Sequence, residues 1–465
     1  MPARSARALA VLAAGAALLA GCGLLPAAPG TLAAADGPCG TAASTSTSTS
    51  TAAAGGRPGP AALTNAPGQL TFAIGSDDSS WLQPLVTTWN RQHPAEQVLP
   101  QYLLPSANDQ LAQLSASLQA RSCFYDVIDM DVVWTAQFAS NGWIVPLPAG
   151  QVPTAGYLAP AVDTARYQGR LYAVPDYTNA DLLYYRSDLV ATPPATWAQL
   201  AADAQKLARP GSGRSGYAAT LAPYEGLTVS FAEAVQSAGG SILGPGPRVT
   251  VDSRQAQAGL GDLVNGVVEG WIPQADLGYE ETQAQQAFES GHFLFMSNWP
   301  DSYAAMQSDR GSQVAGRFSV AALPSLAPGV PGSSSLGGAN LAISAYSRHQ
   351  QAALAFIKYL TDAASERAMF TTGGFPPALA SLYDDPGLRA AYPYLAVLKQ
   401  SIETARPRPA ITNYDQASLA IASAVHAALA GQELPQQALH DLQAQLTQIV
   451  AAGGGGLPRA RSPGA

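Results

Sequence analysis

Apolar residues follow two different spacings along the chain, and each spacing predicts its own kind of element. Short continuous apolar runs bounded by polar residues or glycine indicate buried strands, whereas apolar residues that recur every three or four positions indicate helices. We expect strands at 69–76, 97–105, 123–133, 292–298 and 318–325. We expect helices at 79–94, 108–122, 196–209, 230–239, 282–291, 350–370, 416–431 and 435–450. This alternation predicts an α/β sheet, whose ligands bind beyond the carboxyl ends of the strands.

Three details refine this pattern. Asn108 is a candidate N-cap for the second helix, because its side chain can accept from a free backbone N–H of the first turn. The segment 170–190 is typical of a strand, a crossing and a second strand. Pro175 and Pro223 have small polar neighbours, so we expect the chain to pass between two lobes near them. The folded part, 68–452, is long enough for two lobes with separate cores.

The N-terminus combines two positive charges with a short apolar run. Arg4 and Arg7 precede the run 8–20, which is too short to span a bilayer as an ordinary helix, so 1–21 is expected to be a secretory signal peptide. The four residues that end at Cys22, LAGC, resemble the bacterial lipobox. By that resemblance Cys22 is lipidated and becomes the first mature residue, held at the outer face of the cell membrane. The alternative is a secreted protein without a lipid.

Two segments outside the folded part have the composition of disordered chain. The segment 22–67 is rich in Ala, Ser, Thr and Pro and shows no apolar periodicity, so we expect a flexible tether there. The tail 453–465 is expected to be disordered as well. Once the lipobox has used Cys22, the remaining cysteines are Cys39 and Cys123, which could pair in an oxidising exterior. The sequence does not decide whether they pair.

Composition and motifs exclude several classes of function. The formal net charge is −8 and only 12% of residues are charged, which argues against binding to nucleic acid and against electrostatic binding to a membrane. The five histidines are scattered at no metal-ligand spacing, so neither a metal nor a cofactor is expected. No G-x-S-x-G motif is present, and GSGRSG at 211–216 follows a helix instead of a strand, so it predicts a turn. A glycosidase would need only two carboxylates, and that alternative stays open.

Three aspartates interrupt the strand-like segment 123–133, where an unpaired buried charge would cost several kcal/mol. Asp126 begins the strand and is expected to accept hydrogen bonds from a neighbouring loop. Asp129 shares a face with Asp131 by the two-residue period of a strand, so it is a possible support for a binding site. Asp131 lies at the exit of the strand, where it can bind a ligand or cap the following helix.

Several motifs in order resemble one family. The stretch 123–143, NWP at 298–300 and LGGANLAIS at 336–344 are similar to the extracellular solute-binding proteins of ABC importers, in particular the trehalose/maltose-type sugar-binding lipoproteins of actinobacteria. The resemblance implies a two-lobed Venus-flytrap fold, each lobe a mixed sheet flanked by helices, with the ligand in the cleft between them. It implies one lobe from 68–175 plus about 317–375, and another from about 176–316 plus 376–452.

The same resemblance implies a set of ligand-binding residues. Carboxylates would accept from sugar hydroxyls, and aromatic rings would cover the apolar faces of the sugar. The residues that match the family's positions are Asp77, Asp78, Asp131, Tyr177, Asn179, Glu281, Trp299, Gly338, Arg406 and Arg408. Of the two arginines either one can be the residue that reaches the cleft. The alternatives are a solvated helix face for Glu281, a core position for Trp299 and a surface arginine.

Two positions depart from the trehalose/maltose-type pattern. Asn179 stands where relatives carry an aspartate, and Ala339 stands where they usually carry a tryptophan. Loss of one stacking face costs about 1 kcal/mol of sugar affinity. The sequence therefore predicts a monomeric, non-enzymatic binding protein that delivers a disaccharide such as trehalose or maltose to importer permease subunits, with the ligand's identity open. The alternatives are another small solute, a sensor role, or a secreted glycosidase.

Overall fold

Two mixed β-sheets organise the described residues of the computed structural model, which are 62–208, 211–244 and 248–453. These residues all belong to one unit. The predicted signal peptide, Cys22, Cys39 and most of the tether and of the tail lie outside the described residues.

The larger sheet contains six strands and carries the first predicted elements. Its order is β12-β11-β3-β1-β2, and β6 also pairs with β11. The bounds are β1 Leu70–Gly75, β2 Val98–Leu103, β3 Val127–Asp131, β6 Ala173–Ala180, β11 Ser335–Ile343 and β12 Arg406–Pro407. Strand β1 runs parallel to β2 and β3, and β11 runs antiparallel to β3 and β6. The predicted strands 69–76, 97–105 and 123–133 are confirmed.

The smaller sheet has the order β10-β7-β9-β8. Its strands are β7 Leu182–Tyr185, β8 Ser215–Ala218, β9 Phe293–Asn298 and β10 Ser319–Ala321. Strand β10 pairs with β7, whereas the predicted lobe boundary at about 317 groups β10 with the first lobe. The boundaries of the lobes stay a prediction. A separate hairpin joins β4, Arg166–Tyr167, to β5, Arg170–Leu171.

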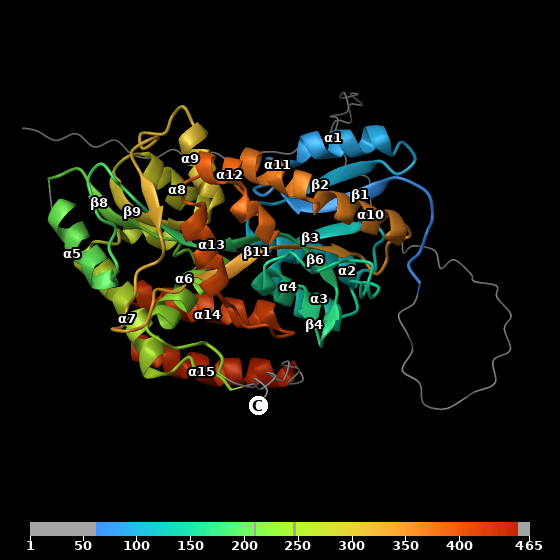
Figure 1. Ribbon diagram of the computed structural model, residues 1–465. Helices are drawn as coiled ribbons and strands as arrows, with labels where there is room; N and C mark the ends of the chain where they lie inside the picture. The colour runs from blue at the N-terminus through green and yellow to red at the C-terminus, as the bar shows by residue number, and fades with distance from the viewer. Residues whose placement is uncertain (1–61, 209–210, 245–247, 454–465) are drawn as a thin grey trace, which may run out of the picture. The chain divides into compact units, whose positions relative to one another are not determined.

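The α-helices lie between and beside these strands (Figure 1). Their bounds are α1 Leu82–Gln92, α2 Ala107–Gln119, α3 Thr135–Ser140, α4 Ala159–Thr164, α5 Trp197–Leu207, α6 Glu225–Ser237, α7 Arg254–Glu269, α8 Glu281–Glu289, α9 Asp301–Ser308, α10 Gln350–Leu360, α11 Ala363–Gly373, α12 Pro386–Ala391, α13 Leu395–Thr404, α14 Tyr414–Leu429 and α15 Pro435–Ala452. Short 3₁₀ turns lie at η1 Val132–Trp134, η2 Gln274–Gly278 and η3 Ala380–Asp384.

The structure corrects two of the predicted helices. The segment 350–370 is divided into α10 and α11, because the Asp362 side chain caps a second helix by accepting from the Ser365 N–H at 2.8 Å. Asn108 is not an N-cap, since α2 begins one residue before it and Ser106 holds the cap position. The Asn108 side chain instead accepts from the backbone N–H of Glu225, 3.3 Å away.

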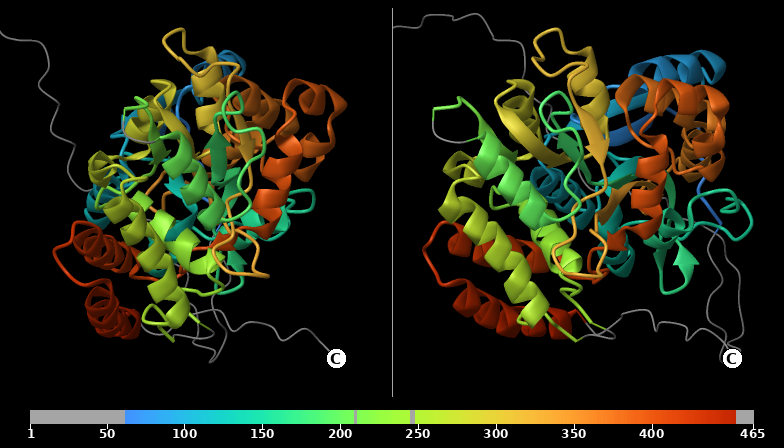
Figure 2. Two further views of the ribbon diagram at one scale, coloured as in Figure 1. Left: turned by 90° about the vertical axis from the view of Figure 1, so that its left-hand side faces the viewer. Right: turned by 60° about the vertical axis from the view of Figure 1, so that its left-hand side comes forward.

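Aromatic side chains fill the cores beside both sheets. Phe72 of β1 packs edge-on against Phe356 of α10, with ring centroids 5.6 Å apart. Tyr184 of β7 contacts Phe288 of α8 in the same manner at 6.5 Å. Full burial of such a side chain contributes about 1.5–3 kcal/mol. Helices α14 and α15, red in Figures 1 and 2, pack side by side and against α6 and α7.

The chain changes from the larger to the smaller sheet at one residue. Asp181 alone separates β6 from β7. Pro175, near which the crossing was expected, lies inside β6, opposite Asn340 where the register of β11 shifts. Proline has no N–H to give to a neighbouring strand, so a register irregularity can accommodate it. The change of sheet thus comes six residues after Pro175, within the segment 170–190 that predicted a strand, a crossing and a second strand.

Candidate functional site

A cavity of about 540 Å³ lies where the carboxyl ends of β1 and β3 meet residues of the smaller sheet. Asp77 and Asp78 enter it from the loop after β1, and Asp129 and Asp131 from the end of β3. Trp299 follows β9 of the smaller sheet and lines the opposite part. The strand-end position is the one that α/β topology predicts for a ligand site.

The cavity brings together all of the predicted site residues except Arg406. Those that line it are Asp77, Asp78, Asp131, Tyr177, Asn179, Glu281, Trp299, Gly338 and Arg408. Arg406 is exposed on β12, and its Nη1 donates to the Gly240 carbonyl oxygen at 3.3 Å. The chain has to continue beyond the short strand β12 before a side chain reaches the cavity, so Arg408 takes the position.

Arg408 is the centre of a buried group of charges at one end of the cavity. Only 4% of the residue is exposed. Its Nη2 donates to Oδ1 of Asp131 at 3.0 Å, and its Nη1 forms a second ion pair with Oε1 of Glu225. Glu225 also accepts from the hydroxyls of Tyr414 and Ser418. Burial raises the pKa of Glu225, and the guanidinium of Arg408 opposes that rise.

Asp131 caps the turn that follows β3, and its role in ligand binding stays a prediction. Its Oδ1 accepts from the Val133 N–H at 3.1 Å and so caps the 3₁₀ turn η1. The same carboxylate pairs with Arg408 and lines the cavity. The cap and the ion pair fix the orientation of Asp131, since Val133 and Arg408 both donate to its carboxylate.

The carboxylates at the other end of the cavity have few partners. Asp77 accepts from the Gln110 side-chain amide at 3.1 Å. Asp129 is 4% exposed, and its Oδ1 has no hydrogen-bond partner among the described residues. Burial, together with the charges of Asp77 and Asp301 among others, raises the pKa of Asp78 well above its usual range. These groups resemble a site prepared for a donor more than a structural network.

Asp77 shows how the walls of the cavity act on a solvent-accessible group. The residue has an open path to solvent, yet the surrounding walls displace much of the water around its carboxylate. This desolvation, with the charges of Glu281 and Asp301, raises the pKa of Asp77 to about 7. The group therefore titrates close to neutral pH.

Aromatic rings form part of the wall. Tyr177 of β6 packs edge-on against Phe375 at a centroid distance of 5.0 Å, and both line the cavity. Trp299 is half-buried and lines the cavity, so a core position does not describe it. Its backbone is held by the Tyr184 hydroxyl, which donates to the Trp299 carbonyl oxygen at 2.7 Å. Such rings can cover the C–H face of a sugar.

The paired glycines of β11 make room for these rings. Gly338 has φ +113°, and a Cβ added there would lie 2.4 Å from the Tyr177 carbonyl oxygen. A Cβ added to Gly337 would lie 2.7 Å from the Trp299 ring. Only glycine fits both positions without displacement of the neighbours. Ala339 follows them with a small side chain that also lines the cavity.

Sequence reasoning missed several residues of the wall. Glu225, Asp301, Glu280, Trp134 and Phe375 line the cavity but were not predicted. Asp301 follows the motif NWP directly, which was a usable signal. Glu225 was not predicted because α6 begins five residues earlier than its apolar pattern indicated. Nothing in the sequence around Phe375 distinguishes it from a core residue.

Asp126 has the structural role expected of it. Its carboxylate accepts from the Thr71 N–H at 2.8 Å and from the Ser347 hydroxyl at 2.6 Å. The residue does not line the cavity. Of the three aspartates on this segment, one ties loops together and two reach the cavity.

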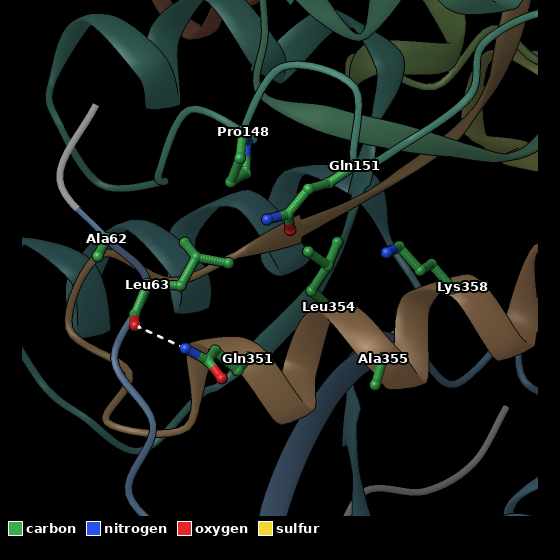
Figure 3. Close-up of a pocket in the computed structure, with 8 residues that line it drawn as sticks. All are labelled: Ala62, Leu63, Pro148, Gln151, Gln351, Leu354, Ala355 and Lys358. Carbon is green, nitrogen blue, oxygen red and sulfur yellow. Dashed lines mark hydrogen bonds between the residues drawn. The ribbon is translucent and has the colours of Figure 1, made fainter. Parts of the chain in front are cut away.

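Two other cavities carry less chemistry. One of about 470 Å³ lies between α10 and the loop that holds Pro148 and Gln151 (Figure 3). Its lining includes Lys358 as the one charged group, and Gln351 donates to the Leu63 carbonyl oxygen at 3.3 Å. The other, of about 190 Å³, adjoins Glu225 and Tyr414 and is mostly apolar. Neither has the convergent polar groups of the main cavity.

Three further observations concern metals, membranes and disulfides. Within 62–208, 211–244 and 248–453, no cluster of His, Cys, Asp or Glu has the arrangement of a metal site. In the same ranges no helix combines the length and the apolar character that crossing a membrane requires. Cys123 is disulfide-bonded. Because Cys22 and Cys39 lie outside the described residues, the pairing of Cys123 with Cys39 stays a prediction.

Comparison with known proteins places the chain among proteins of one family. The model of the family described as bacterial extracellular solute-binding protein matches residues 102–393. A probable ABC transporter-binding protein of Deinococcus radiodurans is 34% identical over 367 residues, which are 75% of this chain and 86% of that protein.

Solved structures show the same fold. The maltose-bound MalE3 protein of T. maritima has a TM-score of 0.78 and 30% identity, and the match covers 82% of this chain and 99% of the other. The GacH receptor of Streptomyces glaucescens, solved without ligand and with acarbose, has a TM-score of 0.74 and 24% identity over 83% and 99% of the two chains. The two-lobed α/β fold class is confirmed. With a family model that spans most of the folded part and a relative of this identity, the chain belongs to the bacterial extracellular solute-binding proteins.

Proposed function

We propose that this protein is the extracytoplasmic binding component of an ABC importer and that it captures a sugar in the cavity between β1, β3 and Trp299. In this proposal the protein acts as a monomer and delivers the sugar to the permease subunits. It performs no chemistry on the sugar. The branch of trehalose/maltose-type proteins remains the nearest guide to ligand size.

One observation carries the proposal: the cavity combines unpartnered acceptors with an aromatic face. Asp129 and Asn179 each have a buried oxygen without a partner among the described residues, and Trp299 lines the same space. A sugar presents hydroxyl donors around its edge and C–H groups on its faces, so it matches both features. A cavity of about 540 Å³ is also within the usual range for small-molecule sites.

The relatives support the same class of function. The Deinococcus radiodurans relative carries the name of a probable ABC transporter-binding protein, and the T. maritima structure holds maltose. Two structures bound to ribitol and to D-mannitol, at 23% and 22% identity, support the fold alone. Ligand identity therefore rests on experiments with this chain.

The anchor forms a second part of the proposal. Cys22 would carry the lipid, and the segment up to residue 67 would serve as a tether to the membrane. Metabolic labelling with a fatty-acid analogue tests this part. We expect label on the wild-type protein and none on Cys22→Ser, and equal label on both would contradict the anchor.

A ligand screen tests the binding function. We expect one or more mono- or disaccharides to raise the unfolding temperature in a saturable manner, with maltose, trehalose and mannitol included in the panel. Trp299→Ala should weaken the sugar that binds by about 10-fold, because loss of an aromatic face costs about 1–1.5 kcal/mol. Trp299→Phe should recover part of the loss.

Phe124→Ala serves as the matched control, since Phe124 is an exposed aromatic residue that does not line the cavity. It should bind the sugar like the wild type. A panel without any saturable response would contradict the proposal. Hydrolysis of aryl glycosides by the purified protein would contradict it too, in favour of a glycosidase.

A further inference from the structure

The cavity carries a strong imbalance of charge. Arg408 is the one basic residue among the described residues that line it, and Asp131 and Glu225 already pair with its guanidinium. Six further carboxylates line the same cavity with no basic partner there, namely Asp77, Asp78, Asp129, Glu280, Glu281 and Asp301. A neutral sugar would bring no charge to these six groups, whereas a cationic one would stabilise their ionised forms.

These carboxylates come from four different elements and act on one another. Asp77 and Asp78 follow β1, Asp129 lies in β3, Glu281 begins α8 and Asp301 begins α9. The charge of Asp78 is opposed by Asp77, Asp129 and Asp301. Burial, with the like charges of neighbouring carboxylates as a smaller cause, raises the pKa of Asp77 to about 7 and that of Asp301 to about 6.

An independent feature points to a donor-rich ligand. Asn179 carries no charge, is 6% exposed and lines this cavity, and its buried Oδ1 has no hydrogen-bond partner among the described residues. Oδ1 of Asp129 is likewise buried without a hydrogen-bond partner among the described residues. A buried acceptor left unpaired costs about 1–3 kcal/mol, so a ligand with several N–H or O–H donors regains that loss.

The residues around the carboxylates favour a cation over a neutral group. Tyr177 is hydrogen-bonded to Asp78, and its ring packs edge-on against Phe375. An ammonium has three donors and no acceptor, which suits a wall made of acceptors. The guanidinium of Arg408 cannot supply this charge, because it is already held in ion pairs with Asp131 and Glu225.

We propose that the sugar recognised by this protein is a basic one, an amino sugar whose protonated amine binds against Asp78 and Asp129 while its ring packs on Trp299. This inference rests on the proposed sugar-binding function and specifies its ligand class. The acceptors bind the ammonium and the neighbouring hydroxyls, and the aromatic ring covers the apolar face. A linear polyamine would use the acceptors alone.

Matched sets of sugars test the inference. Each set contains a hexose with a 2-hydroxyl, a 2-amino or a 2-acetamido group, and a disaccharide set compares cellobiose, the glucosamine dimer and its diacetyl form. Titration calorimetry at pH 7 and low salt measures the dissociation constants. We expect the amine to bind at least 10-fold more tightly than both neutral members in the set that binds best.

Two variants and a control assign the effect to the cavity. Asp78→Asn and Asp129→Asn keep the shape of the side chain but remove its charge, so each should reduce the ratio of amine affinity to hydroxyl affinity by about 10-fold, since a charge-assisted hydrogen bond is worth about 1.5–3 kcal/mol. Asp163→Asn makes the same change in net charge on an exposed residue of α4 that does not line the cavity. It should leave the ratio unchanged.

Proton release gives a second readout. An ammonium lowers the raised pKa values of the carboxylates that it contacts, so its binding at pH 7 should release protons into the buffer. Calorimetry in two buffers with different heats of ionisation measures that release. The affinity for the amine should also increase between pH 5.5 and pH 7.5, because Asp77 and Asp301, whose pKa values are raised to about 7 and about 6, gain negative charge near Asp78 in this window.

The outcomes separate this inference from the proposed function. If the neutral sugars bind as tightly as the amines, the sugar-binding function stands and the inference is wrong. If no sugar of any set binds, both are wrong. Spermidine binding without any amino-sugar binding would overturn the sugar part, and equal stabilisation by Ca²⁺ would show general neutralisation of charge and overturn the inference.

Discussion

The two ends of the cavity hold carboxylates in opposite conditions. At the Arg408 end, both oxygens of Asp131 accept from Arg408, Glu225 forms a second ion pair, and Val133, Tyr414 and Ser418 donate further hydrogen bonds to the two carboxylates. At the other end Asp129 has a buried oxygen without a partner in the part of the chain that the structure describes. Both ends belong to the same wall and share strand β3.

The difference separates residues that shape the site from residues that are available to a ligand. A carboxylate whose oxygens are all occupied gains little from a new donor, and its removal exposes partners that were satisfied. A carboxylate with an unpaired oxygen gains more from a new donor, and its removal leaves fewer partners unsatisfied. Four changes test this contrast, in order of decreasing expected effect.

Removal of Arg408 should give the largest effect on stability. Arg408→Ala leaves Asp131 and Glu225 as buried charges without their partner, so the free energy of unfolding should fall by about 3–5 kcal/mol. Urea denaturation at pH 7 measures it. Arg406→Ala is the matched control, because Arg406 is exposed two residues away, and it should change stability by less than about 0.5 kcal/mol. Equal effects of the two variants would contradict a central role for Arg408.

Two aspartates of the same segment should respond in opposite directions to the same substitution. Asp126→Asn weakens the acceptor for Thr71 and Ser347, so it should destabilise the ligand-free protein by about 1–3 kcal/mol. Asp129→Asn removes an acid whose pKa is raised by burial and whose Oδ1 has no partner among the described residues, so it should stabilise the ligand-free protein while it weakens ligand binding. Thermal unfolding of both variants measures the difference. A loss of stability in Asp129→Asn would mean that its carboxylate has a structural partner.

The pH dependence of stability follows from the buried acids. Burial raises the pKa of Asp176 and of Asp276 to about 8 in the folded protein, whereas in the unfolded chain both titrate near 4. Between these values the folded state binds more protons than the unfolded state, so stability falls as pH rises and levels off above about pH 8. We expect the unfolding temperature of the ligand-free protein to fall between pH 5 and pH 8 by about 2 °C or more.

Asp176→Asn provides the check, since both oxygens of Asp176 lack partners among the described residues. This variant should make the dependence shallower. Asp385, whose pKa is lowered by its hydrogen bonds, acts only below about pH 4 and should not contribute in this window. An unfolding temperature that rises from pH 5 to pH 8 would contradict the assignment.

The smallest expected effect concerns Asn108. Its Oδ1 accepts from the Glu225 N–H at 3.3 Å, at the edge of the Arg408 network. Asn108→Ala should therefore destabilise the protein by about 0.5–1 kcal/mol, the net contribution of one neutral hydrogen bond. Urea denaturation with Asn141→Ala as a surface comparison measures this change. A loss as large as that of Arg408→Ala would show that the helix end depends on this single contact.

Much of the fold follows from local pattern, because short apolar runs and helical spacing depend on neighbours in the chain. The strands up to β3 and the pair β6 and β7 were predicted for this reason. Asp362 divides a predicted helix because its cap outweighs the continuous apolar pattern. Pro175 lies within β6 and not at the change of sheet, because a register irregularity in β11 accommodates it within a strand.

Site residues that lie in short sequence motifs were predictable. Contacts between residues far apart in the chain were not. Asp131 and Trp299 lie in short motifs, and both line the cavity. The partner of Asp131 could not be found this way, because Arg408 is 277 positions away along the chain. Glu225 pairs with Arg408 from a third region of the chain. No local sequence pattern predicts an ion pair between residues so far apart.

The connection between β6 and β7 consists of a single residue, Asp181. Strand β6 belongs to the larger sheet and β7 to the smaller, with this one residue between them. One residue spans at most about 3.6 Å, so the ends of these strands remain neighbours in every conformation of the protein. For protein engineering this makes the position unsuitable as an insertion point or as the new terminus of a permuted chain. The hairpin between β4 and β5, which turns at Gln168 and Gly169, offers a place where such changes leave both sheets intact.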